Sequence, residues 1–190
     1  YVDGVYQSRF TSALIELVDL ERVEVLKGPQ GTLYGRNSTG GAVKYISKEP
    51  SSEFGGKVSI QAGNFDLLRV KAQVDIPLAD RLLFRGAMMR VKRDGYTKDL
   101  LNPSFNHDHD DLLSGRFTLK YVPTDSLEIT LRGAFVNDDG NFSAGKLFSD
   151  TGLFGSATQI ADPRTVMTDF PRTSPERSRS GSVTLKWDTG

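Results

Sequence analysis

Cysteine is absent from the 190-residue chain, and histidine is nearly so, with only His107 and His109 present. A disulfide framework, a thiol nucleophile and a zinc site built on cysteine are therefore excluded. Charge of one sign is also lacking, because 24 Lys and Arg residues balance 24 Asp and Glu residues. A nucleic-acid partner is not expected, since binding through bulk electrostatics normally requires a basic excess.

Long hydrophobic runs are missing too, because no uninterrupted apolar stretch exceeds three residues. This excludes a membrane-spanning helix but not a spanning β-strand, which needs only about 9–11 residues that are apolar at alternate positions. Hydrophobic residues make up 37% of the chain, which is low for a packed globular core. The sequence starts at Tyr1, without Met or a signal peptide, so we expect a piece of a longer protein.

Residues 1–50 mix short elements with glycine-rich turns. Ser12 is a suitable N-cap for a short helix. Pro29 and Gly35 suit the first turn and the end of another short helix. We therefore predict a small α/β unit with a helix over 13–18, a strand over 23–26, a short helix between Pro29 and Gly35, and a strand over 42–47.

Beyond Pro50, apolar and polar side chains alternate with period two, which is typical of antiparallel strands with one apolar and one polar face. In the fourth run, Leu119 is expected to face lipid and Thr118 a wet lumen. The third run is blurred, but aligning its Arg-Gly-Ala with that of the fifth places Arg85 on the polar face. The predicted strands cover 58–62, 68–76, 82–92, 113–121, 127–135 and 181–187.

The connections between these runs differ in length. Those at 77–81 and 122–126 are tight and carry turn residues, whereas those at 93–112 and 136–180 are long. In an up-and-down meander, successive connections emerge at opposite ends, so short turns gather at one end and long loops at the other. This asymmetry is typical of outer-membrane barrels. A soluble β-sandwich also alternates and forms hairpins, and it stays open as the alternative.

The segment from Asp19 to Val43, DLERVEVLKGPQGTLYGRNSTGGAV, closely resembles the end of the plug domain of TonB-dependent outer-membrane receptors. The preceding VDGV at 2–5 is similar to a strand of that family, and Lys48-Glu49-Pro50 matches the exit from plug to barrel. The signature residues, which we expect to be structural, are Gly28, Pro29, Gly31, Tyr34, Gly35, Arg36, Gly40 and Gly41.

The resemblance implies a mainly β fold. Residues 1–50 would form the C-terminal part of the plug domain, a small α/β segment. Residues 51–190 would form the first six antiparallel, up-and-down strands of a transmembrane β-barrel, with extracellular loops 93–112 and 136–180. The whole receptor would have about 22 strands around the plug.

The function implied by the resemblance is active uptake of a scarce ligand across the outer membrane of a Gram-negative bacterium. The ligand is most often a ferric siderophore, although haem, cobalamin or a saccharide are alternatives. The TonB–ExbB–ExbD complex would supply energy through an N-terminal part that this chain lacks. Outer-membrane lipid and lipopolysaccharide are further expected partners. A soluble β-sandwich module that binds a ligand or acts as an adhesin is the alternative function.

The sequence shows no catalytic constellation, because neither a nucleophile elbow nor a pair of acids at helical spacing is present. A nucleotide-binding glycine loop also fails, since Gly35 is followed by Arg36 and not by the Lys of a P-loop. We expect neither enzyme activity nor a cofactor. The glycines are predicted to permit tight turns. The resemblance further implies that charged plug residues pair with acidic residues of the barrel interior, and Arg36 is the candidate for such a pair, because its guanidinium can form two hydrogen bonds to a carboxylate; a solvated turn residue is the alternative.

The cluster His107-Asp108-His109-Asp110-Asp111 is the only one that resembles a metal site. In an extended loop the two imidazoles would lie on one side of the chain, as a metal site would require. The alternative is a solvated loop tip, and we assign no metal. The long connection 136–180 carries aromatic residues that would suit ligand contact and a basic end at 171–179 that would suit lipopolysaccharide phosphates. The candidate ligand-binding residues are His107, His109, Phe142, Phe148 and Phe154.

Overall fold

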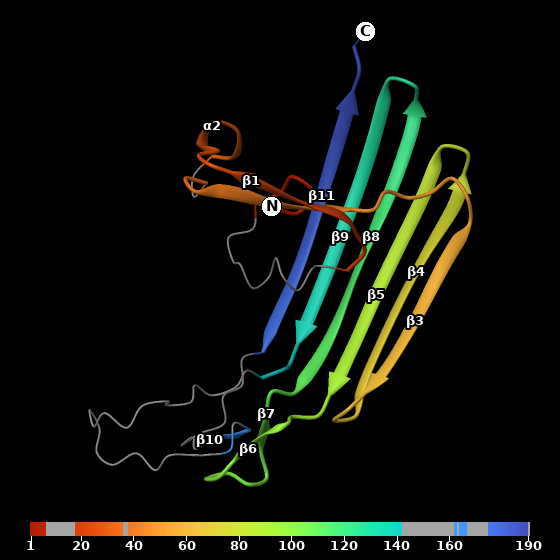
Figure 1. Cartoon of the computed structure of the whole chain (residues 1–190). Coiled ribbons are helices and arrows are strands. Elements are labelled where there is room, and N and C mark those ends of the chain that lie inside the picture. The colour runs from red at the N-terminus through yellow and green to blue at the C-terminus, as the bar shows by residue number, and fades with distance from the viewer. Residues whose placement is uncertain (7–17, 36–37, 142–161, 163, 167–174, 190) are drawn as a thin grey trace.

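The computed structural model describes residues 1–6, 18–35, 38–141, 162, 164–166 and 175–189. Short elements come first and long strands follow (Figure 1). The elements are β1 (Leu20–Lys27), α2 (Gly31–Tyr34), β2 (Gly41–Ser47), β3 (Gly55–Gly63), β4 (Leu67–Ala79), β5 (Leu82–Arg93), β6 (Thr97–Asp99), β7 (Asn106–His107), β8 (Asp110–Thr124), β9 (Leu127–Asp138), β10 (Thr165–Val166) and β11 (Glu176–Trp187).

The long strands form one six-stranded antiparallel sheet in the order β11-β9-β8-β5-β4-β3. This is an up-and-down meander, and it confirms the six strands expected from the alternation. Each strand is longer than predicted, because ladder pairing continues past the last alternating apolar residue. Within the described ranges, the sheet that lies against the meander has only two strands, β1 and β2, and the other small sheet lies at the long-loop end. No second sheet of matching size packs on the meander there, so the β-sandwich alternative is wrong.

The connections of the meander are as unequal as the sequence indicates. Asp80 and Arg81 join β4 to β5, and Asp125 and Ser126 join β8 to β9, whereas 94–109 and 139–175 connect strands at the other end (Figure 1). The two tight turns are tied together, because Arg81 donates to the Pro123 carbonyl and to the Asp125 carboxylate, both at 3.0 Å.

The N-terminal unit, which we define as the described residues among 1–50, is built on an antiparallel pairing of β1 with β2. The predicted strands 23–26 and 42–47 are thus confirmed. Helix α2 ends at Gly35, which adopts a φ of 73°, a conformation that glycine takes without steric cost. Gly41 has a φ of 144°, and a Cβ there would collide with the Leu26 carbonyl oxygen. Most of the helix expected over 13–18 lies outside the described residues.

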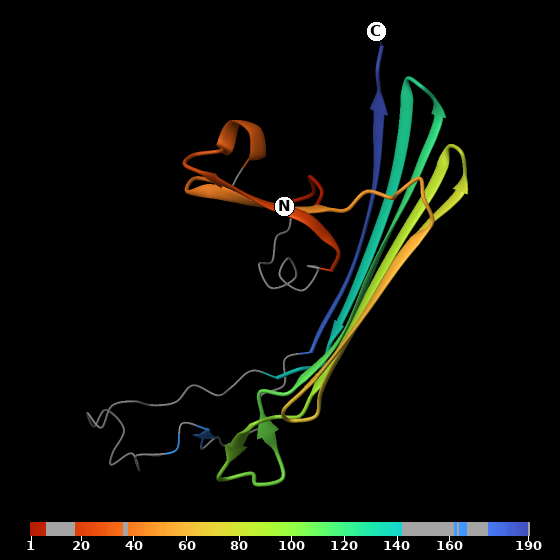
Figure 2. The ribbon, with the colours of Figure 1, turned by 45° about the vertical axis from the view of Figure 1, so that its right-hand side comes forward.

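The N-terminal unit lies against one face of the sheet, which we call the inner face, and leaves the outer face uncovered (Figure 2). Large apolar side chains on the outer face are exposed, such as Ile60 at 70% and Val183 at 64%. On the inner face, Arg85 is 8% exposed and Thr118 only 3%. Thr118 therefore does not sit in a wet lumen as predicted, because it belongs to a covered stretch of the inner face.

A small three-stranded sheet of order β10-β6-β7 lies at the long-loop end (Figure 2). Strand β6 pairs antiparallel with β7 and parallel with β10, which joins the two long connections. Among the described residues, no helix has the length and apolar character needed to cross a bilayer.

Candidate functional site: the interface between the N-terminal unit and the sheet

A buried ion cluster centred on Arg85 of β5 joins the N-terminal unit to the sheet. Its guanidinium donates to both carboxylate oxygens of Asp19, with Nε–Oδ2 at 2.6 Å and Nη2–Oδ1 at 2.7 Å. It also donates to Asp75 and to the Gln73 amide oxygen on the neighbouring strand β4. The Arg85 and Asp19 side chains are only 9% and 4% exposed, so this bidentate pair is held away from water.

A second cluster centres on Asp3. The Arg116 guanidinium of β8 donates to Asp3 at 3.0 Å, and its other Nη donates to the Val18 carbonyl at 3.3 Å. Arg132 of β9 lies 3.9 Å from the same Asp3 oxygen and donates to Glu49 at 2.5 Å. Asp3 in turn accepts hydrogen bonds from the backbone N–H and the hydroxyl of Ser47. The Asp3 carboxylate thus connects β2 to two strands of the sheet, β8 and β9.

The two acids of the N-terminal unit occupy turns that aim their short side chains at the sheet. Asp3 has a φ of 47° and Asp19 a φ of 65°, both in the left-handed region that aspartate tolerates better than most residues. Asp3 is the second residue of a turn that is closed by hydrogen bonds between Val2 and Val5. Asp19 directly precedes β1.

The register of the strands determines which basic residues of the sheet lie at the same level of its inner face. Asp75, Arg85, Thr118 and Arg132 are paired in one row across β4, β5, β8 and β9. The two Arg-Gly-Ala triplets of the sequence therefore lie at the same level of β5 and β9, separated by β8, and their arginines belong to the same face. Alternation places this row on the inner face, where acidic residues of the N-terminal unit contact it.

Further charges extend the network toward the short turns. The Lys120 ammonium lies 3.8 Å from Glu49 and 2.7 Å from Glu128, and Lys186 of β11 lies 2.9 Å from Glu128. Together these pairs connect Glu49, which follows β2, to the edge strand β11 of the sheet. Acidic and basic groups compensate each other along the inner face, which is required where charge is removed from water.

A half-buried pair within the N-terminal unit, more open to water than the clusters above, provides a contrast. The Lys44 ammonium on β2 donates to Glu24 on β1 at 2.8 Å, and this hydrogen bond is the main cause that lowers the pKa of the Glu24 carboxyl below its ordinary value. The same bond raises the pKa of Lys44. Water reaches both groups, so the pair adds little to stability.

The ion pairs described at this interface have the opposite polarity to the pair predicted for Arg36, which stays a prediction. The prediction paired a basic residue of the N-terminal unit, Arg36, with an acidic residue of the barrel. The described contacts instead pair the acidic residues Asp19 and Asp3 of this unit with Arg85 and Arg116 of the sheet. Arg36 itself lies outside the described residues. The sequence signal that could have found the arginines of the described ion pairs is the repeated Arg-Gly-Ala, which puts Arg85 and Arg132 at equivalent inner positions.

The predicted histidine candidates lie at the long-loop end, away from this interface. His107 of β7 is fully buried, its Nε2 lies 3.1 Å from the Asp99 carboxylate of β6, and its ring meets Phe105 edge-on. His109 has its Nε2 3.0 Å from the Asp139 carbonyl oxygen. Asp108 has a φ of 65°, so the backbone between the two imidazoles is not extended.

No group of three or more metal-ligating side chains occurs among the described residues. His107 joins small strands of the long-loop end, so in this arrangement it cannot contact an external ligand. The aromatic candidates Phe142, Phe148 and Phe154 lie outside the described residues. The remaining signature positions, including Gly28, Pro29, Gly31, Tyr34 and Gly40, lie in or next to the β1–α2–β2 unit.

Comparisons with known proteins give one consistent family. Residues 1–42 match the model of the TonB-dependent Receptor Plug Domain. The pesticin receptor of Yersinia pestis is 36% identical over 109 residues, which are 57% of this chain and 16% of the relative. The ferripyoverdine receptor of Pseudomonas aeruginosa is 35% identical over 86 residues, covering 45% of this chain and 11% of the relative.

Solved structures agree over the full chain. The ferric yersiniabactin uptake receptor FyuA from Yersinia pestis superposes with a TM-score of 0.79 at 26% identity, and the match covers 100% of this chain and 29% of that one. The siderophore receptor PiuA from Acinetobacter baumannii gives a TM-score of 0.78 at 18% identity over 100% of this chain and 26% of its own, which shows the shared fold. The chain therefore spans less than a third of each of these proteins. All of them are named as receptors, which confirms the expectation that the protein is not an enzyme.

Proposed function

We propose that this chain, which is part of a TonB-dependent receptor of the Gram-negative outer membrane, serves the energy-dependent uptake of a ferric siderophore. Within that receptor the described residues would supply the last part of the plug and the wall strands that hold it. The TonB–ExbB–ExbD complex would provide the energy. The siderophore class is supported by relatives whose names include ferripyoverdine, ferrioxamine B and ferric yersiniabactin.

The observation that carries the proposal is the ion-paired interface on the inner face. Asp3 and Asp19 attach the N-terminal unit to Arg85, Arg116 and Arg132 of the sheet. Few apolar side chains of this unit are buried, namely Val2, Val18 and Ala42. An interface built on ion pairs can exchange its partners for water without exposing a large apolar surface, which suits a plug that has to shift within a fixed barrel.

Uptake of radioactive iron by cells that express the complete receptor tests this function. The probes are ferric yersiniabactin, ferripyoverdine and ferrioxamine B, each supplied in parallel to a strain with TonB and a strain without it. We expect at least one probe to accumulate only in the strain with TonB. Accumulation that does not depend on TonB, or failure of every ferric siderophore together with uptake of haem or cobalamin, would contradict the proposal.

A further inference from the structure

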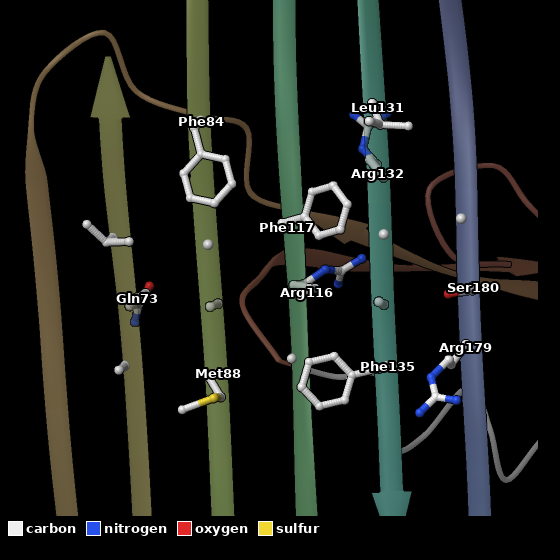
Figure 3. Close-up of a pocket in the computed structure, with 18 of the residues that line it drawn as sticks. Gln73, Phe84, Met88, Arg116, Phe117, Leu131, Arg132, Phe135, Arg179 and Ser180 are labelled. Carbon is white, nitrogen blue, oxygen red and sulfur yellow. The ribbon is translucent and has the colours of Figure 1, made fainter. Parts of the chain in front are cut away.

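The outer face of the sheet carries an apolar groove with a volume of about 1210 Å³ (Figure 3). It extends across all six strands of the sheet, from β3 to β11, on the side away from the N-terminal unit. Glycines and phenylalanines dominate its surface, where neighbouring parts of the same face carry protruding aliphatic side chains such as Ile60 and Leu185. The groove is lined by, among others, Gly86, Gly115, Phe117, Gly133, Phe135 and Gly181.

The hollow follows from strand register. Gly56, Gly86, Gly133 and Gly181 share one row across the sheet with Val74 and Phe117. Four of the six strands therefore present no side chain on this row. A band of glycine on a face that otherwise carries large apolar groups leaves a trough that runs across the strands.

Two phenylalanine rings lie flat across this trough and form part of its floor (Figure 3). The Phe135 ring of β9 reaches over Gly115 of β8, where a Cβ would lie only 2.6 Å from the ring. The Phe117 ring of β8 covers Gly133 of β9 in the same way. The two rings can take this position only because Gly115 and Gly133 lack a side chain, so the sequence itself determines the shallow floor of the groove.

Four basic residues belong to the lining, but Lys57, Arg116 and Arg132 occupy inner-face positions, so Arg179 is the basic residue of the lining at an outer-face position. Arg179 of β11 belongs to its lining and shares a row with Met88, Gly115 and Phe135. It is exposed, and among the described residues no carboxylate forms an ion pair with it. The outer-face arginines one row nearer the long loops differ in this respect, because Arg90 pairs with Asp111 at 2.5 Å and Arg177 lies 3.9 Å from Asp139.

The position of Arg179 defines its surroundings. In outer-membrane barrels the short turns face the periplasm and the long loops face the exterior. Arg179 lies toward the long-loop end of an apolar outer face, so it is at the level of the outer leaflet. An arginine that faces lipid is costly unless an anion compensates it, and guanidinium binds phosphate through paired hydrogen bonds.

We propose that this groove binds lipopolysaccharide, with a lipid A phosphate on Arg179 and an acyl chain over the glycine row. An apolar trough next to an uncompensated cation matches a lipid that carries acyl chains and phosphate on one headgroup. Lipopolysaccharide is the anionic lipid of the leaflet at this level. The proposal rests on the outer-membrane location and is independent of which siderophore is transported.

Native mass spectrometry of the complete receptor in mild detergent tests the proposal, with purified lipid A, dephosphorylated lipid A and phosphatidylglycerol as probes. We expect Arg179→Gln to weaken lipid A retention about tenfold, the loss that corresponds to one charge-assisted hydrogen bond. Gly181→Leu fills the groove, and it should fold normally, since only the Arg132 carbonyl oxygen lies near its Cβ, at 3.7 Å. It should weaken retention of phosphorylated and dephosphorylated lipid A alike.

Lys92→Gln is the matched control, because Lys92 is an exposed cation on the same face that does not line the groove. It should change retention by less than about twofold, as expected for a solvated charge. The proposal is overturned if neither groove variant changes retention or if Lys92→Gln lowers it as much as Arg179→Gln. Equal retention of phosphatidylglycerol, or a receptor dimer that forms in place of lipid binding, would also overturn it.

Discussion

The inner and outer faces of the six-stranded sheet are made by alternate residues of the same strands, yet one face is charged and covered and the other is apolar and exposed. The inner face carries the row Asp75, Arg85, Thr118 and Arg132 and is covered by the N-terminal unit. The outer face carries glycine, phenylalanine and exposed aliphatic residues. Charge is buried where a protein partner compensates it, and apolar surface is exposed where lipid is the solvent.

This comparison explains why neighbours along one strand differ so strongly. Thr118 is buried at 3% exposure, whereas Phe117 is 42% exposed on the other side of β8. A substitution should therefore act through ion-pair compensation on one face and through lipid contact or ring packing on the other. Substitutions on the two faces can therefore be compared to show whether loss of ion pairing or loss of lipid contact and ring packing causes the change in stability.

The largest effect is expected from Arg85→Met. It leaves the Asp19 and Asp75 carboxylates buried without their common partner, and breaking a buried pair in this way costs about 3–5 kcal/mol. In the complete receptor, hydrogen–deuterium exchange should show loss of protection in β1 and β2. Arg69→Met is the control, since Arg69 bonds only the exposed Gln61 within the described structure. Unchanged protection in Arg85→Met would show that this cluster does not hold the N-terminal unit.

The next effect concerns lipid contact. Leu119→Arg places a charge near the middle of the outer apolar face, where an arginine costs about 2–4 kcal/mol. Folding into lipid vesicles, followed by the heat-modified gel shift of the barrel, should drop in yield. Tyr121→Arg lies on the same face of β8 but nearer the short turns, and it should cost less, because the penalty falls toward the interface. Equal losses at 119 and 121 would argue against a depth-dependent lipid environment.

A smaller effect is expected from Gly133→Ala. The new methyl group meets the Phe117 ring and has to displace it, and such overpacking costs about 1–3 kcal/mol. Combining Gly133→Ala with Phe117→Leu removes the ring and should restore part of the loss. Urea unfolding of the complete receptor in vesicles measures both. If the double variant is no more stable than Gly133→Ala alone, the ring does not depend on that glycine.

The smallest effect is predicted for the half-buried pair of Glu24 and Lys44, which water still reaches. The folded-state pKa of Glu24 is lowered, so its contribution is present above the unfolded pKa and is lost as the pH falls through the folded pKa. Hydrogen exchange of the β1–β2 pairing should therefore rise slightly relative to Lys44→Met between about pH 7 and about pH 3. A pH response that is identical in wild type and Lys44→Met would show that the pair contributes nothing.

Period-two alternation and turn residues were enough to predict the six strands, their order and the unequal ends. Glycine and proline punctuation likewise predicted β1, α2 and β2. These features depend on the properties of residues that are close together in the sequence, so a single stretch of sequence is enough to predict them. The covered state of Thr118 was missed, because alternation gives the face of a side chain but not what lies against that face.

The partners across the interface could not be predicted for the same reason. Asp3 and Arg116 are far apart in the sequence, and only the packing of the N-terminal unit brings them within 3.0 Å. The burial of His107 against Asp99 also depends on the small sheet that joins β6, β7 and β10. The glycine row of the outer groove needs the register of all six strands, which no single strand contains.

Accessibility of nitroxide labels along β8 of the complete receptor in vesicles tests the central claim most directly. Labels at 117, 119 and 121 should collide readily with lipid-soluble oxygen, whereas labels at 116, 118 and 120 should be shielded from it by the N-terminal unit and the charged inner face. A smooth profile without period two, or high oxygen accessibility at 116, 118 and 120, would contradict a sheet with one face toward lipid and the other against the plug.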